Sequence, residues 1–328
     1  MRVVEQSKEA GGQPHLRMSL IPGALTEPLF AGGVVPQGMV VSISEGRSID
    51  NNSRQMLQLA YDIAEMSLAT FLKAREQGVP LIGIPIFTGR RFLQSCVLVA
   101  AAAGIETPAD PRGKRVGMPQ FWMTSSVWHR GILQQQHGIA QDVIIWYTAV
   151  EERLGDLAIP TGVEMRRVPS NRSLDELLLD GELDAMMLPR PRDALVKATG
   201  HVRQLYRDLL QAQREYYIAT GVFPIMHLVV MREELDQQYP WLAESLCTAF
   251  QVAKRRAGVA GVGPKPPIKG SSPAEIAAVF GDDPWSYGLA RNRRTLETFI
   301  EFAVTQGLLV QAMSVDTLFA SSSRHLFE

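Results

Sequence analysis

The feature that most constrains the fold is an alternation of short apolar strands with helices along most of the chain. Residues 81–87 and 183–188 are dense apolar runs with the length of buried strands. Residues 123–137 and 174–179 have the pattern of helices, and a glycine closely follows each of them. Because repeated strand–helix alternation is typical of parallel sheets covered by helices, the sequence predicts an α/β protein.

Length and charge narrow the class of protein further. A length of 328 residues favours two domains or lobes. The formal net charge of −1 argues against a broad nucleic-acid-binding or membrane-binding surface, because either would need a clear excess of basic residues. We therefore expect no nucleic-acid partner and no membrane partner, while association of identical chains stays open. Residues 1–14 are expected to form a mobile arm, and they lack an apolar secretory signal, so we expect a cytoplasmic protein.

The cysteines give little sign of metal or redox chemistry. Cys96 and Cys247 lie in apolar stretches and have the surroundings of small core residues, although one disulfide between them stays open. The sequence has no Cys-x-x-Cys motif and no Cys/His cluster, which argues against a structural zinc site.

Polar residues follow several of the expected strands. In open parallel sheets, ligands bind outside the carboxyl ends of the strands, so residues at these positions are candidates for a binding site. Acid, arginine and hydroxyl side chains are found there. They are Glu65, Arg90, Arg91, Thr124, Ser125, Arg190 and Arg192.

The hydroxyl run at 124–126 stands at the start of the helix expected over 123–137. A helix N-terminus offers free N–H groups and a partial positive charge, which suits a carboxylate or phosphate. A simple helix cap is the commoner explanation for such hydroxyls. Trp128 lies four residues after Thr124 on the same helix face, where its ring could cover a planar ligand; core packing is the alternative.

Two further residue types fit an anionic ligand. The guanidinium fork of arginine matches both oxygens of a carboxylate, and we expect about two of five candidate arginines to bind one. These candidates are Arg90, Arg91, Arg130, Arg190 and Arg192. His227 lies inside an apolar run at 221–230, where a structural histidine is the commoner case, but an imidazole can also transfer a proton near neutral pH.

Longer strings of sequence carry a resemblance to a known family. The strings YDIAEMSLATFLKAREQG, IPIFTGRRF, GKRVGMPQFWMTSSVWHRGIL, LDELLLDGELDAMMLPRP, YYIATGVFPIMHLVVMRE and DDPWSYGLARNRRTLETF occur in this order within residues 16–320. Together they resemble the 4,5-dihydroxyphthalate decarboxylase family. Gln120, Trp122, Ser125 and Ser126 depart from the family pattern, which leaves the identity of the ring acid open.

The resemblance implies a two-lobed fold of the type II periplasmic-binding-protein kind, with the ligand in a cleft between the lobes. Lobe one is expected to comprise residues 1–92 and 223–328, and lobe two residues 93–222. Residues 90–91 and 223–227 would then be the crossover segments.

The resemblance also implies an activity: decarboxylation of a hydroxylated aromatic acid without a cofactor. A protein acid would protonate the ring carbon that bears the carboxylate, and carbon dioxide would leave. The expected proton donor is His227. Glu65 is the second choice for that donor, or it orients His227 or a ring hydroxyl, and an ion pair with an arginine is its structural alternative. Glu65 and His227 alone are too few for a usual metal site, so a metal is unsupported, although the question stays open.

The remaining candidates are assigned to the small aromatic carboxylate substrate. Arg91, Arg190 and the Thr124–Ser125 helix start are expected to hold carboxylates, with Arg90 at the crossover. Arg130 would support them or line the cleft, and Trp128 and Phe223 would flank the ring. The alternative function is a solute-binding protein for a small anion, which needs similar groups but no proton donor. Such a protein normally needs export, and the missing secretory signal argues against it.

Overall fold

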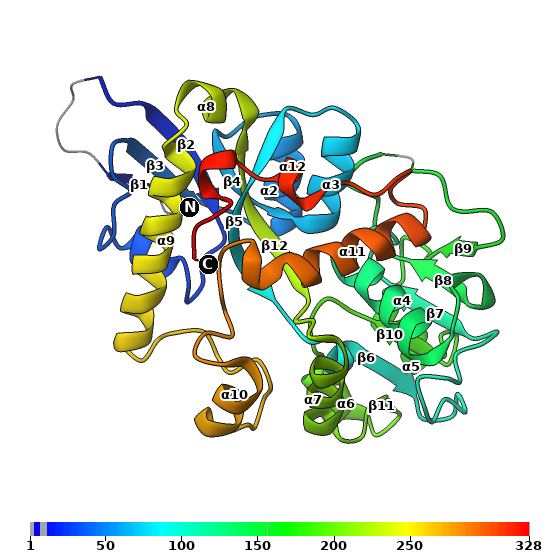
Figure 1. Cartoon of the computed structure of the whole chain (residues 1–328). Helices are drawn as coiled ribbons and strands as arrows, with labels where there is room; N and C mark the ends of the chain where they lie inside the picture. The colour runs from blue at the N-terminus through cyan, green and yellow to red at the C-terminus, as the bar shows by residue number, and fades with distance from the viewer. Residues whose placement is uncertain (1–2, 7–11, 156, 328) are drawn as a thin grey trace. The chain divides into compact units, whose positions relative to one another are not determined.

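The computed structural model describes residues 3–6, 12–155 and 157–327, and it divides into two compact units (Figure 1). Unit 1 comprises Met1–Arg90, Ile225–Glu297 and Met313–Glu328, and unit 2 comprises Arg91–Pro224 and Thr298–Ala312. These units differ from the expected lobes chiefly in residues 298–312, which belong to unit 2. Helix α11 (Arg293–Thr305) therefore begins in unit 1 and ends in unit 2.

Unit 1 contains a six-stranded sheet in the order β1-β3-β2-β4-β12-β5. The strands are β1 (Val3–Gln6), β2 (His15–Leu20), β3 (Val40–Glu45), β4 (Ile63–Ser67), β5 (Leu81–Arg90) and β12 (Ile225–Arg232). Residues 3–6 pair with β3, so the expectation of a mobile arm is wrong for them. Residues 1–2 and 7–11 of that arm lie outside the described residues.

Unit 1 also contains helices, some of which pack on this sheet and build its core. The helices are α1 (Glu27–Phe30), α2 (Ile49–Leu57), α3 (Leu68–Glu76), α8 (Glu233–Gln238), α9 (Leu242–Val259), α10 (Pro273–Phe280) and α12 (Val315–Leu318). The apolar side of α9, including Leu246 and Phe250, packs in one core cluster with Met18 and Val41 of the sheet. Burial of this apolar surface is the main stabilising contribution to unit 1.

Unit 2 has a second six-stranded sheet, in the order β11-β6-β10-β7-β8-β9. Its strands are β6 (Val97–Ala100), β7 (Arg115–Met118), β8 (Ile145–Thr148), β9 (Glu164–Arg167), β10 (Ala185–Met187) and β11 (Val202–Gln204). Its own helices are α4 (Thr124–His137), α5 (Leu174–Leu179), α6 (Asp193–Thr199) and α7 (Leu209–Thr220). The predicted helix ends are confirmed: Gly138 takes the left-handed conformation after α4, and α5 ends shortly before Gly181; in addition, a capping box begins α5 at Ser173.

Strand direction is only partly as expected. Parallel pairing is confirmed among β2, β3 and β4 and among β7, β8, β9 and β10. However, β12 runs antiparallel between β4 and β5, and β6 runs antiparallel beside β10 and β11. Because β12 arrives from a distant part of the chain, the local alternation of strands and helices carried no sign of its direction.

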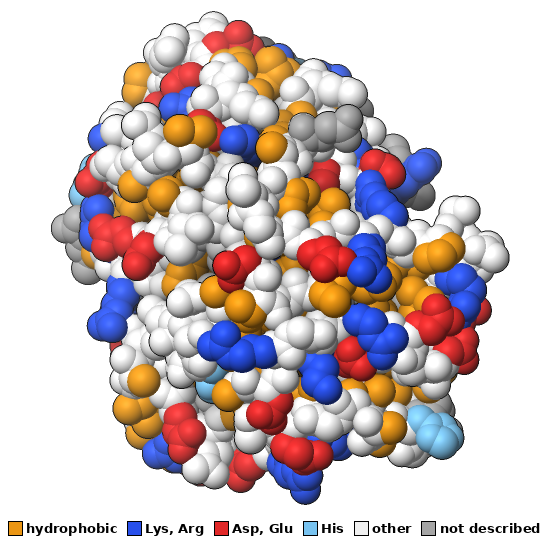
Figure 2. Space-filling model, turned by 90° about the vertical axis from the view of Figure 1, so that its right-hand side faces the viewer, with side chains coloured by type: hydrophobic (Ala, Val, Ile, Leu, Met, Phe, Trp, Pro, Cys, Tyr) orange, Lys and Arg blue, Asp and Glu red, His pale blue; other side chains and the backbone are white. Residues whose placement is uncertain are grey.

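Surface charge agrees with the near-zero net charge. On the face shown in Figure 2, basic and acidic side chains are interspersed rather than gathered by sign. In the described part of the chain, no helix combines the length and the apolar character that crossing a bilayer requires.

Candidate active site

The candidate active site is an acid–imidazole pair on two neighbouring strands of unit 1. Glu65 lies in β4, and His227 lies near the start of β12, 162 residues later in the chain. The strands pair antiparallel with His227 opposite Ser67, so Glu65 and His227 are diagonal neighbours on one face of the sheet. His227 Nδ1 lies 2.9 Å from Glu65 Oε1. The structure thus brings together the two residues predicted to handle the proton.

Both oxygens of the Glu65 carboxylate have a partner. The residue is only 3% exposed, and Oε2 accepts a hydrogen bond of 3.1 Å from the Ile21 N–H, in the loop directly after β2. Strands β2 and β4 are parallel neighbours, which places the residue after β2 close to the end of β4. Since a buried carboxylate is costly unless it is hydrogen-bonded, Ile21 and His227 together stabilise Glu65.

Gly89 makes room for the imidazole. It lies opposite His227 in β5, and a Cβ added to Gly89 would lie 2.7 Å from His227 Nδ1. A side chain at position 89 would therefore displace the ring. The pairing of β12 with β5 is irregular on both sides of His227, and such bulges commonly redirect a side chain next to a functional site.

His227 keeps its second ring nitrogen available. Its side chain is 23% exposed, and Nε2 has no hydrogen-bond partner among the described residues. An ionised carboxylate can only accept hydrogen bonds, so Glu65 in that state holds the Nδ1–H of the ring. Nε2 is then the atom that can give a proton to a reactant or take one from it.

Arg90 is already occupied within unit 1. It is the last residue of β5, and its Nη2 donates to the Ser286 carbonyl at 2.7 Å and to the side-chain oxygen of Asn292. Its guanidinium also lies 5.2 Å from the centre of the Phe87 ring. Through these contacts the buried side chain fastens residues 286–292 to the strand, and binding of substrate by Arg90 stays a prediction.

Arg91 and Arg190, both in unit 2, have fewer side-chain contacts than Arg90. Arg91 is half-buried and Arg190 is exposed, and neither side chain has an ion pair or hydrogen bond to another residue that the structure describes. Burial raises the pKa of the Cys96 thiol to about 11, and the nearby charge of Arg91 opposes that rise. The role of both arginines in holding carboxylates stays a prediction.

A carboxylate of the protein itself binds the turn that leads into α4. Glu152 accepts hydrogen bonds from the Phe121 N–H at 2.6 Å and from the Trp122 N–H at 3.3 Å. Burial raises the pKa of Glu152, and these two N–H groups act in the opposite direction. Sequence reasoning missed Glu152, because a lone acid in a loop carries no pattern that links it to a turn thirty residues earlier. This turn has the geometry to bind carboxylate oxygens.

Unpaired polar atoms lie at the start of α4. Ser125 and Trp122 are buried, and neither Ser125 Oγ nor Trp122 Nε1 has a hydrogen-bond partner within the described residues. Thr124 opens the helix, and Met123 at the N-cap supplies no side-chain hydrogen bond to its first N–H groups. Such unpaired groups are costly unless something satisfies them, so this helix start suits an oxygen-bearing ligand. Binding by Thr124 and Ser125 remains a prediction.

Two aromatic candidates are packed into the core of unit 2. Trp128 is fully buried, and its ring centre lies 5.0 Å from that of Phe299 and 5.6 Å from that of Phe302. Phe223 is also buried and stacks on Phe92 at 4.7 Å. Packing against other aromatic rings accounts for the burial of both side chains, and the expectation that Trp128 and Phe223 flank the substrate ring stays a prediction.

Arg130 is a buried cation within unit 2. Its Nη1 donates to the Phe121 carbonyl at 2.8 Å, its Nε donates to the Gln306 side chain at 2.9 Å, and its guanidinium lies 3.7 Å from the Phe121 ring centre. Burial lowers the pKa of Arg130, and the nearby Glu152 acts in the opposite direction. These partners tie the start of α4 to residue 306, and a role of Arg130 at the ligand site stays a prediction.

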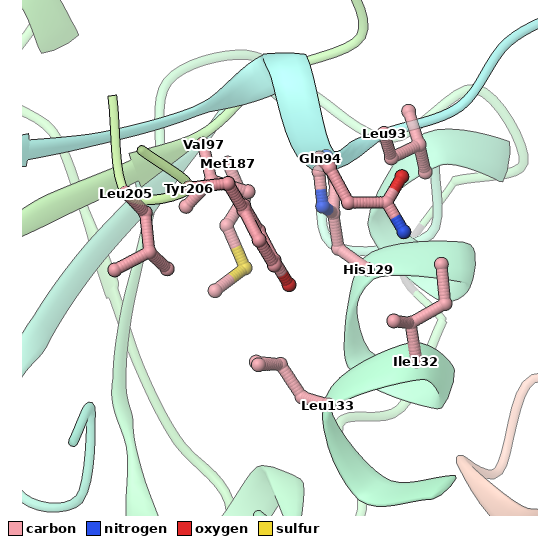
Figure 3. A pocket seen from close by; sticks show the side chains of 9 residues that line it. All are labelled: Leu93, Gln94, Val97, His129, Ile132, Leu133, Met187, Leu205 and Tyr206. Atoms are coloured by element: carbon pink, nitrogen blue, oxygen red, sulfur yellow. The ribbon is translucent and has the colours of Figure 1, made fainter. Parts of the chain in front are cut away.

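His129, also in α4, lies beside a small cavity. Its Nε2 lies 3.0 Å from the Leu188 carbonyl, and burial lowers its pKa to about 4. Figure 3 shows the Tyr206 hydroxyl pointing into this cavity. The cavity volume of about 10 Å³ corresponds to one water molecule. An aromatic acid cannot enter it, so it is not a candidate substrate site.

Metal and disulfide chemistry find no support in the described residues. They contain no group of three or more His, Cys, Asp and Glu side chains that could hold a metal ion. Cys96 and Cys247 are both buried free thiols.

Comparison with known proteins gives the family. No protein-family model matches the chain. Over 281 residues the chain is 32% identical to a 4,5-dihydroxyphthalate decarboxylase from Comamonas testosteroni, and the match spans 82% of this chain and 84% of that protein. It is 33% identical over 165 residues to a 4,5-dihydroxyphthalate decarboxylase from Pseudomonas putida, which spans 48% of this chain and 64% of that protein.

Solved structures give the fold. The periplasmic aliphatic sulphonate binding protein SsuA from Escherichia coli is similar with a TM-score of 0.53 at 13% identity, over 95% of this chain and 99% of that chain. The desulfurization enzyme DSZB is similar with a TM-score of 0.52 at 16% identity, over 94% and 96%. These likenesses show the type II periplasmic-binding-protein fold. Because the Comamonas relative is similar across most of both chains, this chain belongs to the 4,5-dihydroxyphthalate decarboxylase family.

Proposed function

We propose that this chain removes one carboxylate from a hydroxylated aromatic dicarboxylic acid such as 4,5-dihydroxyphthalate, giving 3,4-dihydroxybenzoate and carbon dioxide without a cofactor. The observation that carries the proposal is the Glu65–His227 pair, with a buried carboxylate 2.9 Å from a partly exposed imidazole. Membership of the family supports the reaction class, since the curated relatives are named for this decarboxylation.

The pair is suited to the protonation step. The reacting ring carbon must first gain a proton and then lose its bond to the carboxylate. In the proposed mechanism the protonated His227 gives its Nε2 proton to that carbon, and a new C–H bond forms. The C–C bond then breaks, its electron pair returns to the ring, and carbon dioxide leaves. Solvent returns a proton to His227, whose side chain is partly exposed.

Glu65 has two tasks in this mechanism. In its ionised form it places an opposite charge 2.9 Å from the ring, which favours the imidazolium before the proton is given. It also fixes the ring orientation through Nδ1, so that Nε2 is the nitrogen that meets the reactant. The carboxylate-holding roles predicted for Arg91, Thr124, Ser125 and Arg190 are part of the same proposal.

A second candidate is a binding protein without catalysis. It is favoured by one observation: the similar solved structures include solute-binding proteins such as SsuA. A protein that only binds a solute has no need of a positioned proton donor. The Glu65–His227 pair therefore favours the enzyme.

The test is turnover of 4,5-dihydroxyphthalate by the purified full chain, followed as carbon dioxide release and 3,4-dihydroxybenzoate formation. We expect turnover by the wild type and its loss in folded His227→Ala and Glu65→Ala variants, while an exposed-histidine control, His15→Ala, keeps it. Turnover retained in both site variants would contradict the proposed donor. Thermal stabilisation by the compound without turnover would support the binding protein instead.

A further inference from the structure

We infer that Asn52 is a positioning residue for the Glu65–His227 pair, an inference that rests on the proposed function. Asn52 lies in the first half of α2, is fully buried, and makes its side-chain hydrogen bonds to β2 rather than to either member of the pair. It acts through the end of β2, which supplies the Ile21 N–H to Glu65.

Asn52 holds one residue of β2 by two hydrogen bonds. Its Oδ1 accepts from the Ser19 hydroxyl at 3.1 Å, and its Nδ2 donates to the Ser19 carbonyl at 3.3 Å. Ser19 is also fully buried, so water cannot replace these bonds. Loss of the asparagine amide would leave two buried polar groups of Ser19 without their partner, which favours a local shift of the strand.

The neighbouring residue of α2 holds the adjacent strand in a similar way. Ser53 Oγ accepts a hydrogen bond of 3.1 Å from the Ser67 N–H, at the end of β4. Two consecutive side chains of α2 therefore fix the ends of β2 and β4 relative to each other. Glu65 lies in β4 and its donor Ile21 follows β2, so this spacing determines whether the Ile21–Glu65 hydrogen bond can form.

A close backbone contact completes the arrangement, which we call the α2 clamp (Asn52, Ser53, Ser19 and Gly46). The Gly46 N–H donates to the Leu20 carbonyl at 2.8 Å. A Cβ on Gly46 would lie 2.5 Å from Asn52 Oδ1, so the asparagine reaches β2 only because position 46 has no side chain. The clamp thus fixes Ser19 and Leu20, the two residues that directly precede Ile21.

The clamp determines which oxygen of Glu65 faces His227. With Oε2 held by Ile21, Oε1 is directed at His227 Nδ1. If the end of β2 shifts, Glu65 can rotate, and the imidazole loses the contact that fixes its tautomer. A small displacement of a reacting group can lower the rate about a hundredfold without a change in substrate affinity.

The test compares Asn52→Ala with Asn51→Ala in the full chain. Both variants remove an asparagine side chain from the same helix, but the side chain of Asn51 forms no hydrogen bond recorded among the described residues. We expect Asn52→Ala to lower kcat about 10- to 100-fold with KM within about threefold, and Asn51→Ala to leave both unchanged. Ser19→Ala removes only the hydroxyl that donates to Asn52 Oδ1, keeps the carbonyl that accepts from Nδ2, and should fall between them; it also serves if Asn52→Ala does not fold.

A second readout separates positioning from simple support of the fold. Nitrogen NMR of the His227 ring reports the share of the neutral ring that carries its proton on Nδ1. We expect this share to fall in Asn52→Ala and to stay at the wild-type value in Asn51→Ala. A lower kcat with an unchanged tautomer would overturn the inference, as would no change in either quantity. If the wild type turns over no aromatic acid, the proposed function fails, while the tautomer comparison still decides the role of Asn52.

Discussion

His227 in unit 1 and His129 in unit 2 are the same residue type in opposite surroundings. His227 is partly exposed and its ring lies 2.9 Å from a carboxylate, whereas His129 is fully buried and lies 3.0 Å from a backbone carbonyl. Burial lowers the pKa of His129 to about 4, so a proton on that ring works against the folded state. The partner and the exposure of a histidine thus separate a candidate catalyst from a core residue more reliably than its apolar sequence context.

The same two regions each contain a glycine against which a ring is packed. In unit 1 the ring is the imidazole of His227, above Gly89; in unit 2 it is Phe302 of α11, above Gly131. In both places a Cβ would collide with the ring. The two glycine–ring contacts are of the same kind. At Gly89 the contact positions a reactive group, whereas at Gly131 it only allows two helices to pack closely.

The largest expected effect is a loss of kcat when His227 is replaced by glutamine. The same replacement at His129 is the comparison. His227→Gln removes the proposed proton donor, and general acid catalysis typically contributes 10²- to 10⁴-fold to a rate, so we expect a loss of kcat in about this range. His129→Gln should lower kcat less than about threefold. Steady-state turnover with circular dichroism as a check of folding measures both, and an equal loss in the two variants would erase the distinction between the regions.

The next effect is a loss of folding stability at low pH. It comes from His129, so it should persist in the His227→Gln variant. The pKa of His129 is about 4 in the folded state against about 6.5 in the unfolded chain, so the unfolded chain binds a proton first as the pH falls. Stability that is present above pH 6.5 is therefore lost between about pH 6.5 and 4, on the order of 3 kcal/mol.

Urea unfolding at pH 7 and pH 4.5 measures this loss. We expect His129→Gln to lose less stability on acidification than the wild type, and the exposed His15→Gln to behave as the wild type. The half-buried His137 acts in the same direction, since burial lowers its pKa as well. Glu152 acts in the opposite direction, because its raised pKa favours the folded state at low pH. An identical pH dependence in wild type and His129→Gln would show that His129 does not resist protonation.

The contrast between these regions also shows which features of the fold and of the candidate site could be predicted from the sequence and which could not. Helix α4 could be placed from its hydroxyl start and from Gly138, because both signals are local. Glu65 and His227 could each be chosen as chemically suitable residues. Their contact could not be derived from local pattern, because it requires β12 to insert beside β4 from 162 residues away.

Arg90 is another residue whose contacts could not be predicted from the sequence. The sequence suggested a loop arginine for a carboxylate, but β5 continues through residue 90, and the side chain binds residues 286 and 292. Nothing near Arg90 in the sequence marks these partners. The surroundings of Trp128 could not be predicted for a similar reason, since the rings that bury it come from α11, in the part of unit 2 that follows residue 297.

A third prediction concerns the glycine beneath the proposed donor. Gly89→Ala places a methyl group where the imidazole of His227 lies, so the ring must move away from Glu65. We expect kcat to fall about a hundredfold, the usual consequence of a displacement near 1 Å at a reacting group. The measurement is kcat with the ring tautomer of His227 as a second readout. Wild-type kcat in a folded Gly89→Ala protein would show that the position of the ring is not critical.

The smallest expected effect is at Gly131, where the same substitution should change stability and leave kcat within about threefold. An alanine Cβ there would lie 2.0 Å from a ring carbon of Phe302, so α11 must shift or the ring must turn. Overpacking of this kind typically costs about 1–3 kcal/mol, and we expect a loss of about 2 kcal/mol in urea unfolding.

The matched control is Gly258→Ala in α9, where an added Cβ meets nothing within 4 Å and a gain in helix propensity should leave stability equal or higher. In the double variant Gly131→Ala/Phe302→Leu, the smaller side chain should recover part of the loss, which a double-mutant cycle measures as coupling between the two positions. Independent losses would mean that the ring of Phe302 does not need the space above Gly131, and the similarity between the two glycine contacts would then be geometric only.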